Sequence, residues 1–141
     1  MSPQASTRHL GLDLGATNLK WAMVEQASGD VVGDAGVMAL GGSPSITGHR
    51  LRYMVNRAYW GRGYATEAAR AVVDFAFTEL GHDTLSAGAR VTNPASRRIL
   101  EKCGFQWTGV GLCRIRAIHS SAPIDRFRLD RGLWVSLKSW G

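Results

Sequence analysis

Lysine, cysteine and long apolar runs are scarce in this chain of 141 residues. Only three lysines occur, so arginine carries most of the net charge of +6. No apolar run approaches the roughly 18 residues that a helix needs to cross a bilayer, and this excludes an ordinary membrane span. The first eight residues lack the apolar stretch of a secretory signal. We therefore expect a cytoplasmic protein with no membrane partner.

The two cysteines, Cys103 and Cys113, lack the spacing of metal ligands, and we expect no metal. In a protein that stays inside the cell they are expected as reduced core thiols rather than as a disulfide. The composition, 45% hydrophobic and 20% charged, is typical of a soluble globular chain large enough for one core.

The surplus of arginine favours an anionic partner, because guanidinium groups match phosphate and carboxylate geometry. Two partners fit this charge, nucleic acid and a polyphosphate cofactor, and a merely solvated basic surface would look the same. The chain has no stacking-plus-basic motif and no zinc spacing, which argues against nucleic acid. Charge alone does not choose between the remaining two interpretations.

Apolar periodicity and turn clusters predict one sheet with helices packed on it, an α/β (α+β) fold. We expect strands at 9–14, 19–26, 31–40, 49–57, 84–91, 105–118 and 124–129, with a loop around 120–123 between the last two. Helices are expected at 64–80, from Pro94 to the glycine at 104, and at 131–139, where Leu133, Trp134 and Leu137 would pack.

The strongest helical pattern is the segment 64–80, whose apolar residues repeat at the spacing of one buried face. The expected buried positions are Ala65, Ala68, Ala69, Val72, Val73, Ala76 and Leu80. Gly81 is well placed to end this helix in the left-handed conformation.

The segment Gly61-Arg62-Gly63 joins a predicted strand directly to this helix. The first amides of a helix lack internal partners and lie at the positive end of its dipole, so they can bind a pyrophosphate. A glycine turn without a ligand is the alternative interpretation. The segment is neither a P-loop nor a full dinucleotide fingerprint, because Thr66 stands at the place of the third glycine.

Two longer strings give this segment a family resemblance. The string Tyr59-Trp60-Gly61-Arg62-Gly63-Tyr64-Ala65-Thr66-Glu67-Ala68 resembles the cofactor loop of GNAT acetyltransferases, in the branch that acetylates ribosomal-protein N-termini and small amines. The string 93–105, from Asn93-Pro94 to Gly104-Phe105, resembles the next helix and strand of that family. The resemblance covers about residues 21–141, and it implies a mixed, mostly antiparallel sheet with flanking helices.

The resemblance implies acetyl-CoA as the co-substrate and an amine as the acceptor. The implied pyrophosphate-binding residues are Gly61, Arg62, Gly63, Tyr64, Ala65 and Thr66. The backbone of Met54 and Val55 would pair with the pantetheine arm, Asn93 would bond it, and Ser96 would lie near the sulfur or the phosphates. Helix capping is an equal and compatible role for Asn93. Arg97 and Arg98 would meet the adenosine phosphate or form a solvated helix face.

The implied reaction is attack of a neutral amine on the thioester, helped by positioning and carbonyl polarisation. The chain departs from the family at two acid–base places, where Arg50 replaces a glutamate and Leu100 replaces a tyrosine. Ser96 is the remaining catalytic candidate. Possible bases are Glu25, Asp34, His49 and Glu67, each of which also suits an ordinary surface or capping role. A catalytically defective CoA-binding remnant is therefore the alternative function.

The N-terminal segment 1–20 is atypical, because a complete GNAT domain has a strand and two helices before its first hairpin. Residues 10–20 instead resemble the first phosphate motif of ROK-type sugar kinases, which suggests a fused or truncated chain and a third, kinase-like function. Residues 10–14 are expected to supply a substitute edge strand. Without those two helices, apolar surface that they normally cover would be exposed, which predicts a homodimer.

Overall fold

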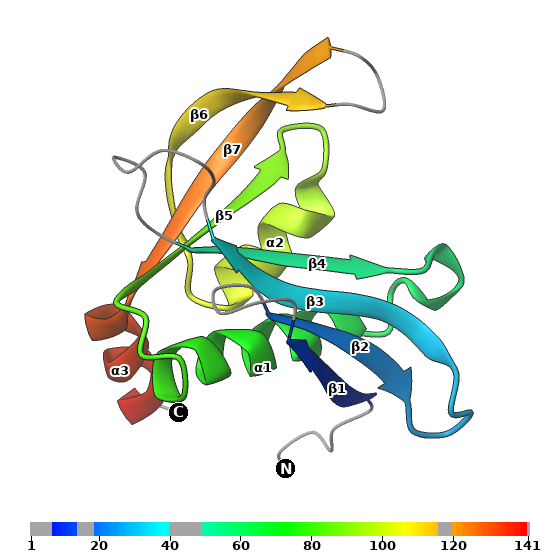
Figure 1. The fold of residues 1–141 in the computed structure, drawn as a ribbon. Helices are drawn as coiled ribbons and strands as arrows, with labels where there is room; N and C mark the ends of the chain where they lie inside the picture. Colours follow the sequence, from blue (N-terminus) through cyan, green and yellow to red (C-terminus); the bar gives the residue numbers. More distant parts are fainter. Residues whose placement is uncertain (1–6, 14–18, 40–48, 116–119, 141) are drawn as a thin grey trace.

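The computed structural model describes residues 7–13, 19–39, 49–115 and 120–140 (Figure 1). Its strands are β1 (Thr7–Asp13), β2 (Leu19–Glu25), β3 (Val31–Ala39), β4 (His49–Val55), β5 (Thr84–Arg90), β6 (Gln106–Ile115) and β7 (Ser120–Asp130). Its helices are α1 (Tyr64–Thr78), α2 (Pro94–Lys102) and α3 (Arg131–Trp140), with a short 3-10 turn at Arg57–Tyr59. The predicted α+β fold with a mixed, mostly antiparallel sheet is confirmed.

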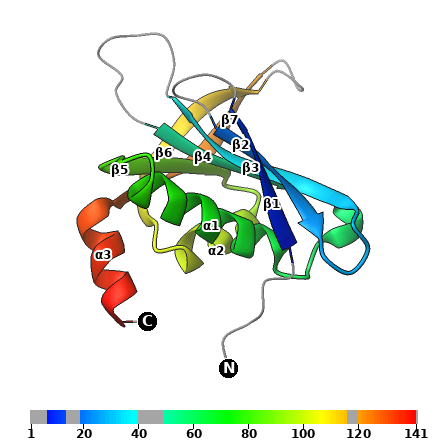
Figure 2. The same cartoon turned by 60° about the horizontal axis from the view of Figure 1, so that its bottom comes forward.

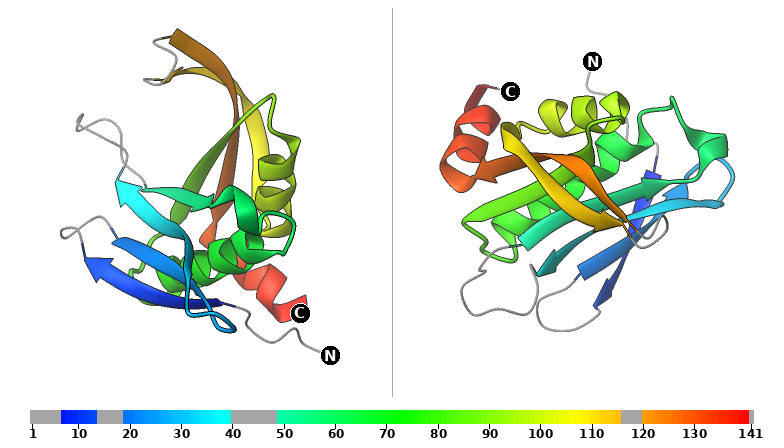
Figure 3. Two further views of the ribbon diagram at one scale, coloured as in Figure 1. Left: turned by 90° about the vertical axis from the view of Figure 1, so that its right-hand side faces the viewer. Right: turned by 90° about the horizontal axis from the view of Figure 1, so that it is seen from above.

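The seven strands form one sheet in the order β1-β2-β3-β4-β5-β7-β6. Every neighbouring pair is antiparallel except β4 and β5, which run parallel. That parallel pair is short: it joins His49 to Leu85 and Arg50 to Ser86, and the pairing stops there. Beyond this point β4 and β5 diverge, and the two halves of the sheet twist away from each other (Figures 1 and 3). The diverging half of β4 thus has one backbone edge without a partner among the described strands.

The N-terminal strand β1 pairs with β2 along its whole length at the edge of the sheet. Its range, Thr7–Asp13, begins two residues before the predicted strand. Only residues 14–18 separate β1 from β2, too few for the two helices that precede the hairpin in a complete GNAT domain.

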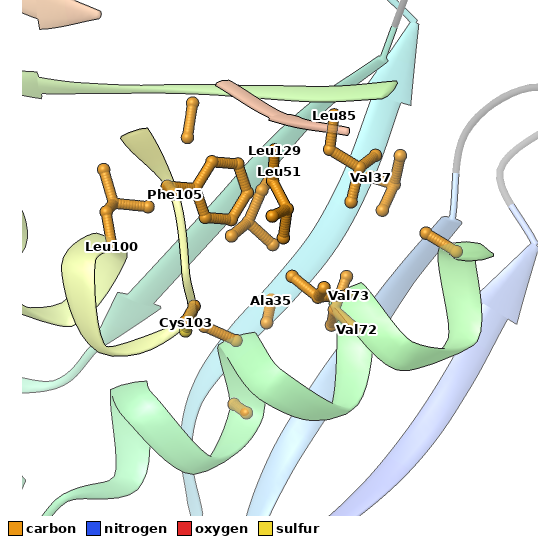
Figure 4. Close-up of a cluster of buried hydrophobic side chains, with 14 of the residues drawn as sticks. Ala35, Val37, Leu51, Val72, Val73, Leu85, Leu100, Cys103, Phe105 and Leu129 are labelled. Atoms are coloured by element: carbon orange, nitrogen blue, oxygen red, sulfur yellow. The ribbon is translucent and has the colours of Figure 1, made fainter. Parts of the chain in front are cut away.

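All three helices lie on the same side of the sheet (Figure 2). Helix α1 packs on β3 and β4, α2 packs on β5 and α1, and α3 packs on β7. The buried core between these helices and the sheet includes Val37, Leu51, Val72, Val73, Leu85, Leu100, Phe105 and Leu129 (Figure 4). The opposite face of the sheet carries no helix of the described chain.

The buried face of α1 follows the predicted stripe with corrections at its ends. Tyr64 and Phe77 are buried although the stripe omitted them. Ala65 is only partly buried and Leu80 is 38% exposed, although the stripe included both. Leu80 lies beyond the last helical residue, so the helical period no longer sets its direction. Gly81 does adopt the left-handed conformation predicted for the helix end, with φ of 69°.

The predicted loop around 120–123 is wrong, because these residues belong to β7. They pair with the end of β6, from Ser120 opposite Ile115 to Pro123 opposite Leu112. Strand β5 does not reach this far along β7, since its pairing with β7 ends at Ile124. Pro123 therefore lies just beyond the β5 ladder, where its carbonyl still accepts a 3.2 Å hydrogen bond from the Val91 amide but a missing amide is tolerated.

Some of the remaining side-chain predictions are confirmed and others are not. Leu133 and Trp134 of α3 pack against the core as predicted, whereas Leu137 is 45% exposed and touches Gly104. Cys103 is a buried free thiol, and burial raises its pKa to about 11. The side chain of Cys113 lies outside the described part of the structure. None of the helices in the described ranges is long and apolar enough to cross a bilayer.

Candidate functional site

A cavity of about 510 Å³ opens on the helix side of the sheet, where β4 ends and the chain passes through residues 56–63 into α1. Its walls come from the end of β4, the turn, the start of α1 and one face of α2. The lining residues are Tyr53, Met54, Val55, Tyr59, Trp60, Gly61, Gly63, Tyr64, Ala65, Thr66, Asn93, Ala95, Ser96, Arg98, Ile99 and Lys102. Of the predicted cofactor residues, all except Arg62 line this cavity.

The glycine turn presents an open N-terminus of α1 to the cavity. Gly61 and Gly63 both have φ of 79°, a left-handed conformation that disfavours other residues, and no atom lies within 4 Å of a Cβ built on either one. Gly63 caps the helix without a side-chain hydrogen bond. The first amides of α1 are therefore available to an anion, and the helix dipole favours negative charge there.

Two basic side chains of α2, Arg98 and Lys102, line the same cavity. They lie one helical turn apart, so they share a face of α2. With the N-terminus of α1 they give the cavity a positive lining, which would attract a polyanion such as a diphosphate.

The open edge of β4 forms another wall. Met54 and Val55 pair with Asp34 and Gly33 on one side, while their other side has no strand partner. Trp60 folds back over this strand, and its indole Nε1 donates a 2.7 Å hydrogen bond to the Val55 carbonyl. The edge can accept an extended ligand as an added strand, which is a common way to bind a linear chain.

Asn93 and Ser96 meet at the N-terminus of α2. The Asn93 side-chain oxygen accepts a 3.1 Å hydrogen bond from the Ser96 amide, so the predicted capping role is confirmed. Because the cap uses only Oδ1, the Asn93 amide nitrogen can still donate to a ligand in the cavity.

Tyr53 reaches across from β4 to this same helix end. Its hydroxyl lies 2.6 Å from Ser96 Oγ and donates to the Ser96 carbonyl at 3.1 Å. Burial raises the pKa of Tyr53, an effect that the Ser96 hydrogen bond only partly offsets. The tyrosine therefore remains protonated at neutral pH and can serve as a proton donor.

Arg62 is turned away from the cavity. Its guanidinium lies 3.1 Å from the Glu25 carboxylate and 5.2 Å from the centre of the Tyr59 ring. Glu25 also accepts hydrogen bonds from the Tyr64 and Ser28 hydroxyls, and the bond from Tyr64 is the main cause of its lowered pKa. This network fixes the first residue of α1 to β2. It also shows that Glu25 has its carboxylate oxygens engaged rather than free to act as a base.

The other predicted acid–base residues lie outside the cavity. Asp34 forms a 3.5 Å ion pair with Lys20. His49 stacks on His82, with ring centres 3.7 Å apart, and burial lowers its pKa. Glu67 is also absent from the cavity lining.

The two departures from the family pattern are equally clear in the structure. Leu100 is fully buried in the core, and Arg50 is exposed on the face of the sheet opposite the helices. Arg97, predicted together with Arg98, instead pairs with Glu101 at 3.0 Å.

Several lining residues were missed by the sequence reasoning, namely Tyr53, Tyr59, Ala95, Ile99 and Lys102. A signal for part of this set exists, because positions 95, 98, 99 and 102 fall on one face of a helix. No sequence pattern links Tyr53 to Ser96, since the two are 43 residues apart and meet only through the fold.

The comparison with known families agrees with this site. The profile described as "Acetyltransferase (GNAT) domain" matches residues 3–106, which is well over half of the chain. The chain therefore belongs to the GNAT acetyltransferase domain family. The match includes the N-terminal strand β1 as well as the glycine turn and α2.

The individual relatives include a probable N-acetyltransferase. The chain is 45% identical over 58 residues to the probable N-acetyltransferase YjcK of Bacillus subtilis, covering 41% of this chain and 32% of that one. It is 33% identical over 88 residues to the uncharacterized protein YkkB of the same organism, covering 62% of this chain and 51% of that one. The matched part of the chain thus spans about half or less of the length of these curated relatives.

Solved structures share the fold. A chimera of the spermidine N-acetyltransferase SpeG from Vibrio cholerae and hSSAT superimposes with a TM-score of 0.73 at 14% identity, covering 86% of this chain and 73% of that one. A GNAT-family acetyltransferase from Bacillus anthracis superimposes with a TM-score of 0.68 at 23% identity, covering 84% and 68%. At these identities the likeness establishes the fold alone.

Proposed function

We propose that this chain is an N-acetyltransferase that moves an acetyl group from acetyl-CoA to a primary amine, either a protein N-terminus or a small amine. The observation that carries the proposal is the cavity, in which the open N-terminus of α1 and the basic pair Arg98 and Lys102 lie beside the unpaired edge of β4. This arrangement suits a ligand that has a diphosphate at one end and an extended polar arm at the other.

The residues present fit acetyl-CoA. The amides from Gly61 to Thr66 would hold the diphosphate, and the β4 edge at Met54 and Val55 would pair with the amide-containing arm. The Asn93 side chain would donate to the same arm. When bound, acetyl-CoA supplies the activated acetyl group. Arg62 would contribute to cofactor binding only through its backbone in the turn, because its side chain is paired with Glu25.

The pair of hydroxyls at Ser96 and Tyr53 is the part of the cavity that can handle a proton. Tyr53 Oη holds a proton at neutral pH, which it donates to the Ser96 carbonyl. Rotation of this hydroxyl would direct the proton to Ser96 Oγ, 2.6 Å away, and so to the α2 end of the cavity. This refines the prediction that Ser96 acts alone: we propose that Ser96 and Tyr53 act together as the acid that protonates the leaving thiolate.

The alternative is a domain that binds CoA without turnover. It draws support from the core position of Leu100 and from the exposed Arg50, since neither supplies the acid or base that the family pattern has there. Calorimetry with acetyl-CoA, CoA and ATP, followed by a thiol-release assay over a panel of amines and N-terminal peptides, separates the possibilities.

Each outcome of this experiment has a defined meaning. Binding of both CoA forms with thiol release supports the proposed enzyme, and Tyr53→Phe should then lower kcat about 100-fold with little change in KM, within the usual range for loss of a general acid. CoA binding without release for any acceptor supports the remnant. Binding of ATP but not CoA would support the kinase-like function implied by residues 10–20 and would overturn the proposal.

We further propose that the chain is cytoplasmic, belongs to the ribosomal-protein branch of the family and forms a homodimer. A related fold is that of the ribosomal-protein-S5-alanine acetyltransferase of Vibrio fischeri, with a TM-score of 0.72 at 15% identity. Support for self-association comes from edge strand β6, where Trp107, Val110 and Leu112 are all more than half exposed. Sedimentation equilibrium should give twice the chain mass, and Leu112→Lys should return it to one.

We also propose that residues 1–20 are a unit added to a cofactor-binding domain at 21–141. Under this division, a chain that begins at residue 21 should still bind CoA, because the described lining of the cavity comes from residues 53–66 and 93–102. Loss of CoA binding in that shortened chain, with a folded circular dichroism spectrum, would show that the segment belongs to the domain.

A further inference from the structure

The face of the sheet opposite the helices is unusually rich in arginine. Alternate residues of a strand point to opposite faces, and on β4 the side chains of Leu51, Tyr53 and Val55 face the helices. The intervening residues therefore face the other way. By the same alternation this face, called here the open face, carries the exposed side chains of Arg50, Arg52, Arg90, Arg126 and Arg128.

Acidic groups on the open face do not balance this charge. Asp34 is paired with Lys20 at 3.5 Å, and Asp130 is paired with Arg128 at 2.7 Å. Within the described ranges no ion pair is formed by Arg50, Arg52, Arg90 or Arg126. Arg52 donates to the sulfur of Met38, at 3.4 Å. Four of the five guanidinium groups of the open face, all except that of Arg128, therefore have no carboxylate partner among the described residues.

These arginines surround the place where β4 and β5 part. The last paired residues are Arg50 and Ser86, and Arg52 follows immediately on the diverging part of β4. The backbone edge that the divergence exposes is the same edge that borders the helix-side cavity at Met54 and Val55. A molecule lying on the open face can thus approach this edge from the side opposite the cavity.

The distance between the arginines indicates how long a partner must be to contact more than one of them. Arg50 on β4 and Arg128 on β7 both pair with Ser86 of β5, so two strand spacings, about 10 Å, lie between their backbones. Arg52 and Arg126 lie farther apart, because β4 and β5 diverge beyond this pair. A small amine with one carboxylate would not contact both positions. An extended peptide with several acidic side chains would, and each carboxylate would meet a guanidinium with a matching fork of donors.

We propose that the open face binds the acceptor, and that the acceptor is the N-terminal amine of a peptide whose following residues are acidic. This inference rests on the proposed N-acetyltransferase function and specifies its substrate. The same charges would repel a polycation, so spermidine, named for one of the structural neighbours, is predicted to be a poor acceptor here.

The test compares four acceptors: a peptide with an N-terminal Ala and four following Asp or Glu residues, its Asn/Gln counterpart, its Lys counterpart, and spermidine. We expect the acidic peptide to have the highest kcat/KM and to lose its advantage as salt is raised. We expect Arg50→Gln/Arg52→Gln to lower kcat/KM for the acidic peptide about tenfold, through two charge-assisted contacts, while the affinity for CoA is unchanged. Lys138→Gln, which removes a distant positive charge on α3, should have no effect.

Binding is measured separately from turnover, so that the two proposals can fail independently. Fluorescence anisotropy of the labelled acidic peptide in the presence of CoA should show tighter binding than that of the Asn/Gln peptide, and weaker binding to the double variant. If CoA binds and amines are acetylated without any preference for the acidic peptide, the inference is overturned and the proposed function stands. If the acidic peptide binds the open face but nothing is acetylated, the site is real and the proposed function fails.

Discussion

The two faces of the sheet carry different kinds of side chain. On the helix side the strands supply apolar side chains, and the acidic groups there, Glu25 and Asp125, are buried and hydrogen-bonded. On the open face the charged groups are exposed and predominantly arginine. Strand β4 contributes to both, since Tyr53 lines the cavity while Arg52, its neighbour in sequence, lies on the other face. A single strand can therefore carry residues for two ligands that approach from opposite sides.

The largest difference between the two faces is expected from a substitution that blocks the helix-side anion site at the N-terminus of α1. Gly63→Val should weaken CoA binding about 100-fold, equal to about 2.7 kcal/mol, because a β-branched residue cannot hold the left-handed turn that opens the α1 N-terminus. Isothermal titration calorimetry measures the loss. The open face is not altered, so peptide binding measured by anisotropy should change little.

Gly29→Val is the matched control for this substitution. Gly29 has φ of 77° in the β2–β3 turn, and as at Gly63 no atom lies within 4 Å of an added Cβ. Both variants should lose a similar amount of stability, but only Gly63→Val should lose CoA affinity. Equal CoA affinities in the two variants would show that the glycine turn does not bind the cofactor.

A second prediction compares an acidic residue of each face. Asp125 on the helix side is 5% exposed and accepts a 2.8 Å hydrogen bond from Trp107 Nε1, and Arg97 lies 3.7 Å away. Asp125→Ala should lower the free energy of unfolding by about 2 kcal/mol, as the loss of a buried charge-assisted bond does. Asp34→Ala on the open face should cost below about 1 kcal/mol, because its pair with Lys20 is exposed. Urea unfolding of both variants checks the order, which a larger loss for Asp34→Ala would contradict.

The smallest predicted effect concerns the junction of β4 and β5, where His49 stacks on His82. The Nε2 atoms of both rings are buried without a hydrogen-bond partner in the described structure, and burial is the main cause that lowers both pKa values. The unfolded chain therefore binds protons more readily at these residues, so their contribution to stability is complete above the ordinary value of 6.5 and is lost as the pH falls below it.

Thermal unfolding at pH 7.5 and pH 5.5 measures this effect, with a lower Tm expected at pH 5.5. The charges of Arg131 and Asp83 also act on His82, with opposite effects on its pKa: Arg131 lowers it and Asp83 raises it. His82→Phe keeps a ring at the stack but removes one titrating group, so the difference in Tm between the two pH values should shrink. An unchanged difference would show that the pH dependence arises elsewhere.

Local patterns in the sequence were sufficient for most of the fold. The 3.6-residue period identified α1, the Asn93-Pro94 pair identified the start of α2, and Gly81 marked the end of α1. The failures have two causes. Residues 120–123 were predicted to form a loop because of Pro123, but they pair with β6, and that pairing is not encoded near them in the sequence. Leu80 is exposed for a local reason, because the helix ends at Thr78.

The features of the candidate site can also be divided into those that local sequence patterns predict and those that depend on the tertiary structure. The glycine turn, Asn93 and Ser96 could be predicted, because each lies at the start of a helix and has a local signature. Three features could not be predicted: the Tyr53–Ser96 hydrogen bond, the contact of Arg62 with Glu25, and the place of Lys102 in the cavity wall. The two contacts join residues far apart in the chain, and the wall position depends on how α2 packs.

The sequence by itself determined the elements that depend on near neighbours along the chain: the helix with its glycine turn, the capped second helix and the alternation of the strands. Only the tertiary structure decided which of these elements meet. The early parting of β4 from β5 opens one backbone edge, and the placement of every helix on the same side leaves the arginines of the opposite face exposed. Backbone conformation follows from local sterics and hydrogen bonds, whereas the pairing of distant strands depends on the packing of the whole core.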